Sequence, residues 1–139
     1  MQKHFKFKND RIYFNGKLCR PVKNNNGLRA IALIEYNNVK SVIKYDGSKG
    51  LDQSTFEWKL WKRISKRDRK YFQKILAYTP GWIVQEFFTA KIGKPTAKNR
   101  EIIQKLADKY DLYDVSSNDC GRNWCVRSDG IPIIFDFGV

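Results

Sequence analysis

The stretch RAIALIEYNNVKSVIKYDGSKGLDQSTFEWKLWKRI (29–64) decides the fold, because its patterning changes from strand to helix within one short segment. Two apolar-rich runs, 29–36 and 39–45, flank the dipeptide Asn37-Asn38, which predicts a β-hairpin. After the turn-forming residues 46–50, apolar residues recur at helical spacings. We therefore expect a helix over about 52–65, with Asp52 as its N-cap and a short continuation to Phe72.

The flanking sequence extends this pattern in both directions. Turn formers separate short β-rich runs before and after the central stretch, which predicts two further antiparallel pairs, at 5–9 with 11–18 and at 74–79 with 82–88. A loop rich in Lys and Gly then leads to Thr96, where a helix to about Tyr110 begins. A last hairpin is expected from the runs 124–127 and 131–137, which are joined by a Ser-Asp-Gly turn.

The predicted fold class is therefore α+β: an antiparallel sheet with a packed helix, then one helix and a small β-hairpin. Without a repeat, a low-complexity tract or a linker, the chain is expected to form a single domain over 1–139. Within it, residues 1–88 would supply the sheet and its helix, and residues 89–139 a connector, the second helix and the hairpin.

Composition excludes several classes of protein. The chain has 139 residues, 42% of them hydrophobic and 14% aromatic, which is too rich in core-forming side chains for a disordered polyelectrolyte. It has no long apolar run and no signal-peptide pattern, and its Cys count of 3 is odd, so we expect reduced thiols and a soluble cytoplasmic protein without a membrane partner. The net charge of +13 favours anionic partners, whether nucleotides, nucleic acid or acidic proteins.

Several polar residues occur in an order that resembles the protein-kinase-like fold: Lys44 in a strand, Glu57 in the next helix, Gln85-Glu86-Phe87 at a strand end, Asn123, and Asp136 in Asp-Phe-Gly. In that family the strand lysine contacts the phosphates and pairs with the helix glutamate, while the Asn and the DFG Asp hold magnesium. The resemblance implies ATP and Mg²⁺ as cofactors. Lys44, held by Glu57, would then bind the phosphates, and backbone groups of 85–87 would contact the adenine. Asn123 and Asp136 would bind the metal ion.

Physical chemistry gives an independent reason for these residue types. A triphosphate needs a fixed cation, a hard metal ion with oxygen ligands, and a group that holds the cation in place. Lys44, the oxygens of Asn123 and Asp136, and the carboxylate of Glu57 would meet these needs.

Three departures from the family pattern bear on activity. The loop expected to cover the phosphates, 23–27, has only one glycine, Gly27. The position of the catalytic Asp holds Asn118, whose amide cannot take a proton. Either its neighbour Asp119 substitutes, with Lys44 also acting in catalysis, or the base is missing and the chain is a pseudokinase. The sequence stops at Val139, just past Asp-Phe-Gly, so we expect a minimal, C-terminally truncated kinase-like protein without a substrate-binding lobe.

Two alternatives compete with a Mg-nucleotide-binding protein that could act as a phosphotransferase. One is an inactive kinase-like protein that binds and regulates an acidic protein partner. The other is a nucleic-acid-binding module that uses the basic run from Lys59 to Lys70, in which Trp61, Tyr71 and Phe72 would stack on bases. The exposed apolar surface of so short a lobe favours homo-oligomers. Small size and a composition rich in Lys and Asn are typical of a phage-encoded protein acting in the host cytoplasm.

Overall fold

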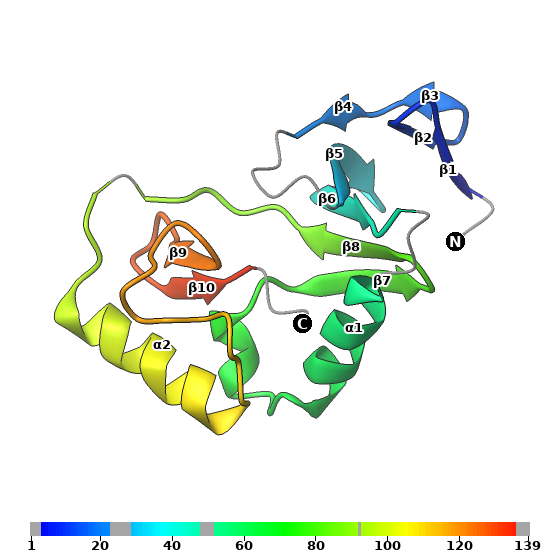
Figure 1. Ribbon diagram of the computed structural model, residues 1–139. Coiled ribbons are helices and arrows are strands. Elements are labelled where there is room, and N and C mark those ends of the chain that lie inside the picture. Colours follow the sequence, from blue (N-terminus) through cyan, green and yellow to red (C-terminus); the bar gives the residue numbers. More distant parts are fainter. Residues whose placement is uncertain (1–3, 23–28, 48–51, 92, 136–139) are drawn as a thin grey trace. The chain divides into compact units, whose positions relative to one another are not determined.

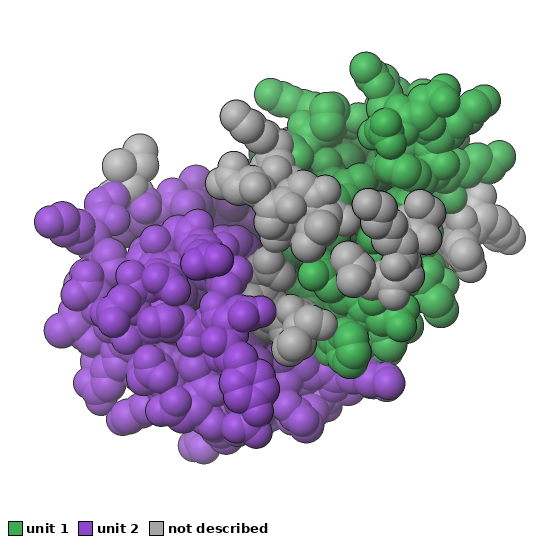
Figure 2. Space-filling view, in the orientation of Figure 1, with its two compact units in different colours: residues 1–58, 75–87 green, residues 59–74, 88–139 purple. Residues whose placement is uncertain are grey.

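The computed structural model of the chain describes residues 4–22, 29–47, 52–91 and 93–135 (Figure 1). These residues form antiparallel sheets and two α-helices, so the coarse α+β prediction is confirmed. The chain divides into two compact units, residues 1–58 with 75–87 and residues 59–74 with 88–139, which are described separately below (Figure 2). No helix among the described residues is long and apolar enough to cross a membrane.

The first unit is built on a five-stranded antiparallel sheet of order β4-β5-β6-β8-β7. Its strands are β4 (Arg20–Pro21), β5 (Ala30–Tyr36), β6 (Val39–Tyr45), β7 (Ile75–Thr79) and β8 (Trp82–Glu86). The central hairpin is confirmed, and its turn residues Asn37 and Asn38 have φ angles of 49° and 64°. A two-residue hairpin turn with positive φ at both positions matches the strand twist, and Asn tolerates that conformation better than most residues.

A three-stranded meander covers one face of this sheet. It consists of β1 (Phe5–Lys8), β2 (Arg11–Phe14) and β3 (Lys17–Leu18). Side chains of the meander and the sheet share one buried apolar cluster, in which the rings of Phe5 and Trp82 stack at 5.6 Å. Ile43 and Val84 belong to this cluster, so the alternating positions Lys44, Ile83 and Gln85 face the opposite side of the sheet.

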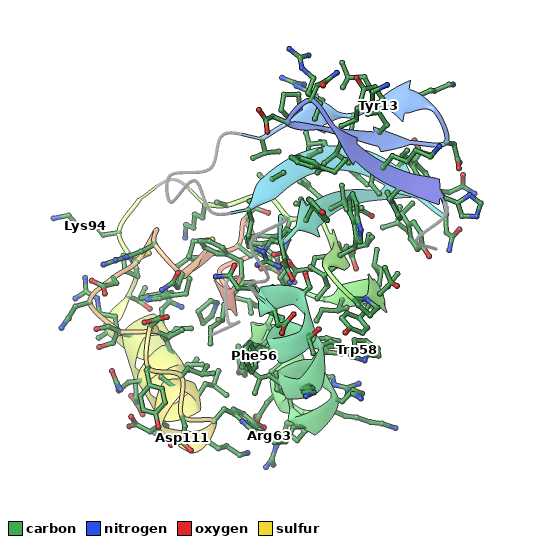
Figure 3. All side chains as sticks on the ribbon, turned by 45° about the vertical axis from the view of Figure 1, so that its right-hand side comes forward. Tyr13, Phe56, Trp58, Arg63, Lys94 and Asp111 are labelled. Atoms are coloured by element: carbon green, nitrogen blue, oxygen red, sulfur yellow. The ribbon has the colours of Figure 1, made fainter. Side chains whose placement is uncertain are left out.

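The helix α1 (Gln53–Arg63) begins on that opposite side. Thr55 shares a hydrogen bond of 2.7 Å with the hydroxyl of Tyr78. Trp58 lies on the same helix (Figure 3), and its ring stacks on the ring of Tyr78 at 5.4 Å. The helix ends two residues before the predicted boundary of 65, at Arg63. The expected continuation to Phe72 is a turn followed by the short 3-10 helix η2 (Asp68–Tyr71).

The second unit contains α2 (Ala97–Lys109) and the hairpin of β9 (Trp124–Val126) and β10 (Pro132–Ile134). Both elements confirm the prediction. Thr96 caps α2 through a hydrogen bond of 3.0 Å from the Asn99 N–H, and the Asn99 side chain accepts from the Thr96 N–H in return. The Trp124 side chain is fully buried and donates to the Ser116 carbonyl at 2.7 Å, which joins the hairpin to the preceding loop.

Candidate functional site

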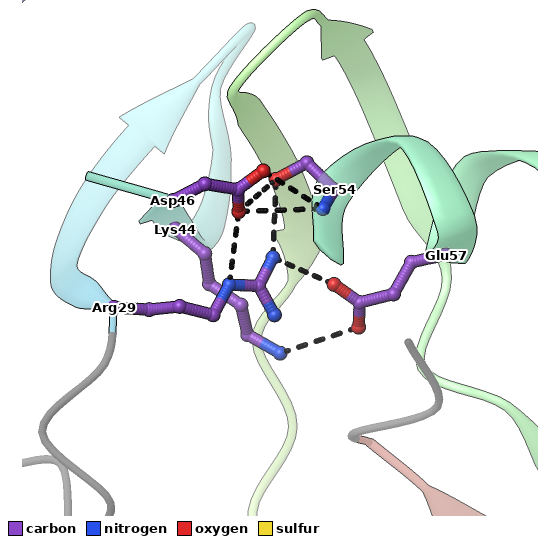
Figure 4. A network of polar contacts seen from close by, with 5 residues as sticks. All are labelled: Arg29, Lys44, Asp46, Ser54 and Glu57. Atoms are coloured by element: carbon purple, nitrogen blue, oxygen red, sulfur yellow. Dashed lines mark hydrogen bonds and ion pairs between the residues drawn. The ribbon is translucent and has the colours of Figure 1, made fainter. Parts of the chain in front are cut away.

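Four charged side chains and one serine form a buried polar network in the first unit (Figure 4). We call these residues the buried network: Arg29, Lys44, Asp46, Ser54 and Glu57. Arg29 directly precedes β5, Lys44 lies on β6, and Asp46 directly follows β6. Ser54 and Glu57 are three residues apart on α1, so both project from the same side of the helix. The network thus joins the central hairpin to the first turns of α1.

Asp46 binds the start of α1. Its carboxylate accepts a hydrogen bond of 3.0 Å from the Ser54 N–H and another of 2.8 Å from the Ser54 hydroxyl. A carboxylate at a helix N-terminus is stabilised by the unpaired N–H groups there. Asp52 directly precedes the helix, as predicted, but the carboxylate that binds the first turn is that of Asp46.

Glu57 lies between two cations and is completely buried. Arg29 Nη2 is 2.6 Å from Glu57 Oε1, whereas Lys44 Nζ is 3.9 Å from Glu57 Oε2. Arg29 also pairs with Asp46 at 3.2 Å and donates to Ser54 Oγ at 3.1 Å. Two cations therefore balance two carboxylates, which is the arrangement that buried charges need to offset the loss of hydration. Sequence reasoning paired Lys44 with Glu57 and missed Arg29, the closer partner.

Gln85 places an unsatisfied hydrogen-bond donor and acceptor on the face of the sheet that also carries Lys44. It pairs in register with Val42, two residues before Lys44, so its side chain lies on the Lys44 face. The side chain is fully buried, and in the described part of the chain neither its amide nitrogen nor its oxygen has a hydrogen-bond partner. Such a group costs about 1–3 kcal/mol when left unsatisfied. Native proteins retain few of them, and each calls for a reason.

The two residues after Gln85 complete the segment expected to serve an adenine. Glu86 ends β8 and is exposed. The Phe87 N–H donates to the Lys40 carbonyl at 3.0 Å, and the Lys40 ammonium lies 4.1 Å from the centre of the Phe87 ring. The Phe87 N–H is therefore engaged within the protein.

Three of the expected catalytic and metal residues, Asn118, Asp119 and Asn123, lie in and beside one loop of the second unit. Asn118 is exposed, and its N–H donates to Ser116 Oγ at 3.3 Å. Asp119 is half-buried, and its N–H donates to the Ser116 carbonyl. The Asn123 amide nitrogen donates to the Asp114 carbonyl. Gly27 and Asp136 lie outside the described residues, so their predicted roles stay predictions.

Asp68 anchors the basic run onto α2. Its carboxylate accepts hydrogen bonds of 2.7 Å from the Lys109 ammonium and 2.6 Å from the Tyr110 hydroxyl. These contacts, that of Lys109 first, lower the pKa of Asp68 from 3.8 to about 2, against the opposing effect of burial. The predicted stacking role of the neighbouring aromatics is not met by Trp61 and Phe72, since both side chains are buried.

The buried network can hold a cationic side chain at a fixed place beside a helix terminus. Its charges balance, and a phosphate group near Lys44 or Arg29 would compete with the carboxylates for those cations. Comparison of the chain with protein-family models, with curated proteins and with solved structures found no match.

Proposed function

We propose that the chain binds a magnesium–nucleotide complex, with Lys44 as the cation that contacts the phosphates and Glu57 as the carboxylate that holds it in position. The observation that supports this proposal most is the buried ion pair between Lys44 and Glu57. It lies within an element order of hairpin, helix and second strand pair, in which β8 is hydrogen-bonded beside β6. That order agrees with the one that the kinase-like resemblance implies.

The unequal distances around Glu57 suit a phosphate-binding lysine. Arg29 holds Glu57 at 2.6 Å, while Lys44 at 3.9 Å is beyond hydrogen-bond distance from that carboxylate. Turning the ammonium toward a phosphate would then break no short contact with Glu57. Arg29 would keep α1 and Glu57 in place during that movement, because it also contacts Asp46 and Ser54.

Magnesium would need oxygen ligands, and the kinase-like resemblance implies Asn123 and Asp136 for this role, which stays a prediction. The Asn123 side chain is compatible with this role, since its nitrogen donates to Asp114 and the metal would use the other amide atom, the oxygen. A bound magnesium ion would screen the charge of the phosphates. Gln85 supports a polar ligand on the Lys44 face, because its buried amide offers one donor and one acceptor edge.

The proposal covers binding and stops short of phosphoryl transfer. Asn118 stands where the family has its base, and an amide does not accept a proton at neutral pH. The same binding site would serve the alternative in which the chain regulates an acidic protein partner without catalysing a reaction.

Isothermal titration of ATP, with and without Mg²⁺, would test the proposal on the wild type, Lys44→Met and Asp136→Ala. We expect magnesium-dependent binding by the wild type that both substitutions weaken at least tenfold. A ligand at 100 times its Kd would also raise the stability of the wild type by about 2.7 kcal/mol. Lys44→Met should fold, because Glu57 keeps Arg29 as a partner.

The matched control is Lys8→Met, which removes an exposed lysine from a strand of the same unit. It should bind as the wild type does. The proposal would be wrong if the wild type bound no nucleotide, or if Lys44→Met and Lys8→Met bound equally well.

A further inference from the structure

Exposed basic side chains are concentrated on residues 59–74, which we call the basic segment. It contains eight Lys or Arg residues and one acidic residue, Asp68. Seven of the basic side chains are exposed: Lys59, Lys62, Arg63, Lys66, Arg67, Lys70 and Lys74. Asp68 is buried and already bound by Lys109 and Tyr110, so no exposed carboxylate of the segment itself offsets this charge.

Contacts within the basic segment and with the end of α2 hold its conformation. The Arg69 guanidinium donates to the Trp61 carbonyl at 3.0 Å and lies 4.8 Å from the centre of the Trp61 ring. At the end of α1 (Figure 3), Arg63 donates to the Tyr110 carbonyl at 3.3 Å. Asp68 fixes η2 to α2 in the same way. The segment is thus preorganised, and a ligand would not have to order a flexible chain.

The nature of the exposed side chains indicates the class of partner. Every aliphatic or aromatic side chain of the segment is buried or half-buried, so none offers the exposed apolar anchor that a protein interface normally has at its centre. Lys, which protein interfaces tend to exclude, supplies five of the seven exposed cations. A surface of this kind matches the phosphate backbone of nucleic acid, which is recognised mainly by Lys and Arg.

Burial of the aromatic side chains also argues against recognition of nucleic-acid bases by the basic segment. Trp61 and Phe72 are buried, and Tyr71 is half-buried with the Lys70 ammonium 5.0 Å from its ring centre. Without an exposed ring, the segment lacks a platform on which a base could stack. Lys59, Lys62 and Arg63 instead share one side of α1 at helical spacing, which places their charges next to one another.

We propose that the basic segment binds the phosphate backbone of nucleic acid without regard to base sequence. This binding uses no residue of the buried network, so it is independent of the proposed nucleotide site.

The test is fluorescence anisotropy with two labelled DNA duplexes of unrelated sequence and about 20 base pairs, between about 50 and 200 mM salt. The test variant carries Lys59→Gln, Lys66→Gln, Arg67→Gln and Lys70→Gln. The matched control carries Lys6→Gln, Lys8→Gln, Arg11→Gln and Lys17→Gln, which remove the same number of exposed cations from the meander. Circular dichroism would confirm that all three proteins fold.

We expect the wild type to bind both duplexes equally, with an affinity that falls steeply with salt. Each lost phosphate contact should reduce the magnitude of the slope of log K against log salt by about 0.9. With four cations removed, the slope of the test variant should be smaller than that of the wild type by about 3 to 4. In the control variant the same slope should decrease by less than about 1. Lys44→Met should bind DNA as the wild type does, which separates this result from failure of the nucleotide proposal.

Three results would overturn the inference. The first is an equal loss of affinity and slope in the test and control variants, which would mean diffuse attraction by the whole chain. The second is a strong preference for one of the two duplexes. The third is binding to polyglutamate, or to vesicles containing phosphatidylserine, that is tighter than binding to DNA at the same salt.

Discussion

Replacing Asp68 with Asn should destabilise the protein at neutral pH, and the loss of stability should shrink as the pH falls toward 3. The carboxylate receives hydrogen bonds from the Lys109 ammonium and the Tyr110 hydroxyl, which lower its pKa from 3.8 to about 2. Asn has the same shape and can still accept from Tyr110. It cannot carry the negative charge that makes these contacts strong.

The size of the effect follows from the pKa. A shift from 3.8 to about 2 corresponds to about 2 kcal/mol of stabilisation of the folded state, at about 1.4 kcal/mol per pH unit. Because the pKa of Asp68 is lower in the folded state, this stabilisation is fully present above the unfolded value near 3.8 and is lost as the pH falls through about 2. We therefore expect Asp68→Asn to cost about 2 kcal/mol at pH 7, and about half of that at pH 3.

The assay is urea unfolding of both proteins at several values between pH 7 and pH 3, followed by tryptophan fluorescence. Trp61 and Trp124 lie in the same unit as Asp68, and Trp58 and Trp82 lie in the other, so the fluorescence reports on both units. The control is Asp108→Asn, an exposed aspartate that accepts one hydrogen bond from Gln104, and it should change stability by less than about 0.5 kcal/mol. A difference between wild type and Asp68→Asn that does not shrink from pH 7 to pH 3 would refute the reasoning.

Two further predictions concern the first unit. Arg29→Met should lower the free energy of unfolding by about 3–5 kcal/mol in urea, because it removes the cation that pairs with both buried carboxylates, Asp46 and Glu57, whereas the exposed Arg11→Met should cost under about 0.5 kcal/mol. A loss below about 1 kcal/mol for Arg29→Met would contradict the ion-pair argument. Gln85→Met should raise the free energy of unfolding by about 1–2 kcal/mol, because an apolar side chain of similar shape replaces the unsatisfied amide. The melting temperature should rise accordingly. The reverse result, a lower melting temperature, would show that the amide is satisfied in solution.

Turn chemistry made most of the fold predictable. Asn37-Asn38 set the central hairpin and therefore its register, in which Ala30 pairs with Tyr45. Extending that register by one residue places Arg29 opposite Asp46, so this ion pair could have been predicted from the sequence as a cross-strand pair of opposite charge. The contact between Arg29 and Glu57 could not, because it depends on how α1 docks against the sheet.

The basic run shows where periodicity misled the prediction. A continuation of the helix to Phe72 was expected, but α1 ends at Arg63. Beyond it, Asp68 accepts hydrogen bonds from Lys109 and Tyr110. The sequence placed Trp61 among lysines and arginines, and its ring is buried beneath Arg69 instead of being exposed for stacking. Composition alone does not distinguish these two environments of an aromatic ring.

The helix α1 is one continuous element that belongs to both compact units, with Glu57 in the first and Lys59 in the second. One residue, Trp58, separates the carboxylate proposed to hold Lys44 from the first cation of the basic segment. Because Arg29 holds Glu57 and Ser54, a nucleotide that draws Lys44 away would leave in place the helix that carries Lys59. By thermodynamic linkage, any factor by which a nucleotide changes the affinity for nucleic acid must equal the factor by which nucleic acid changes the affinity for the nucleotide.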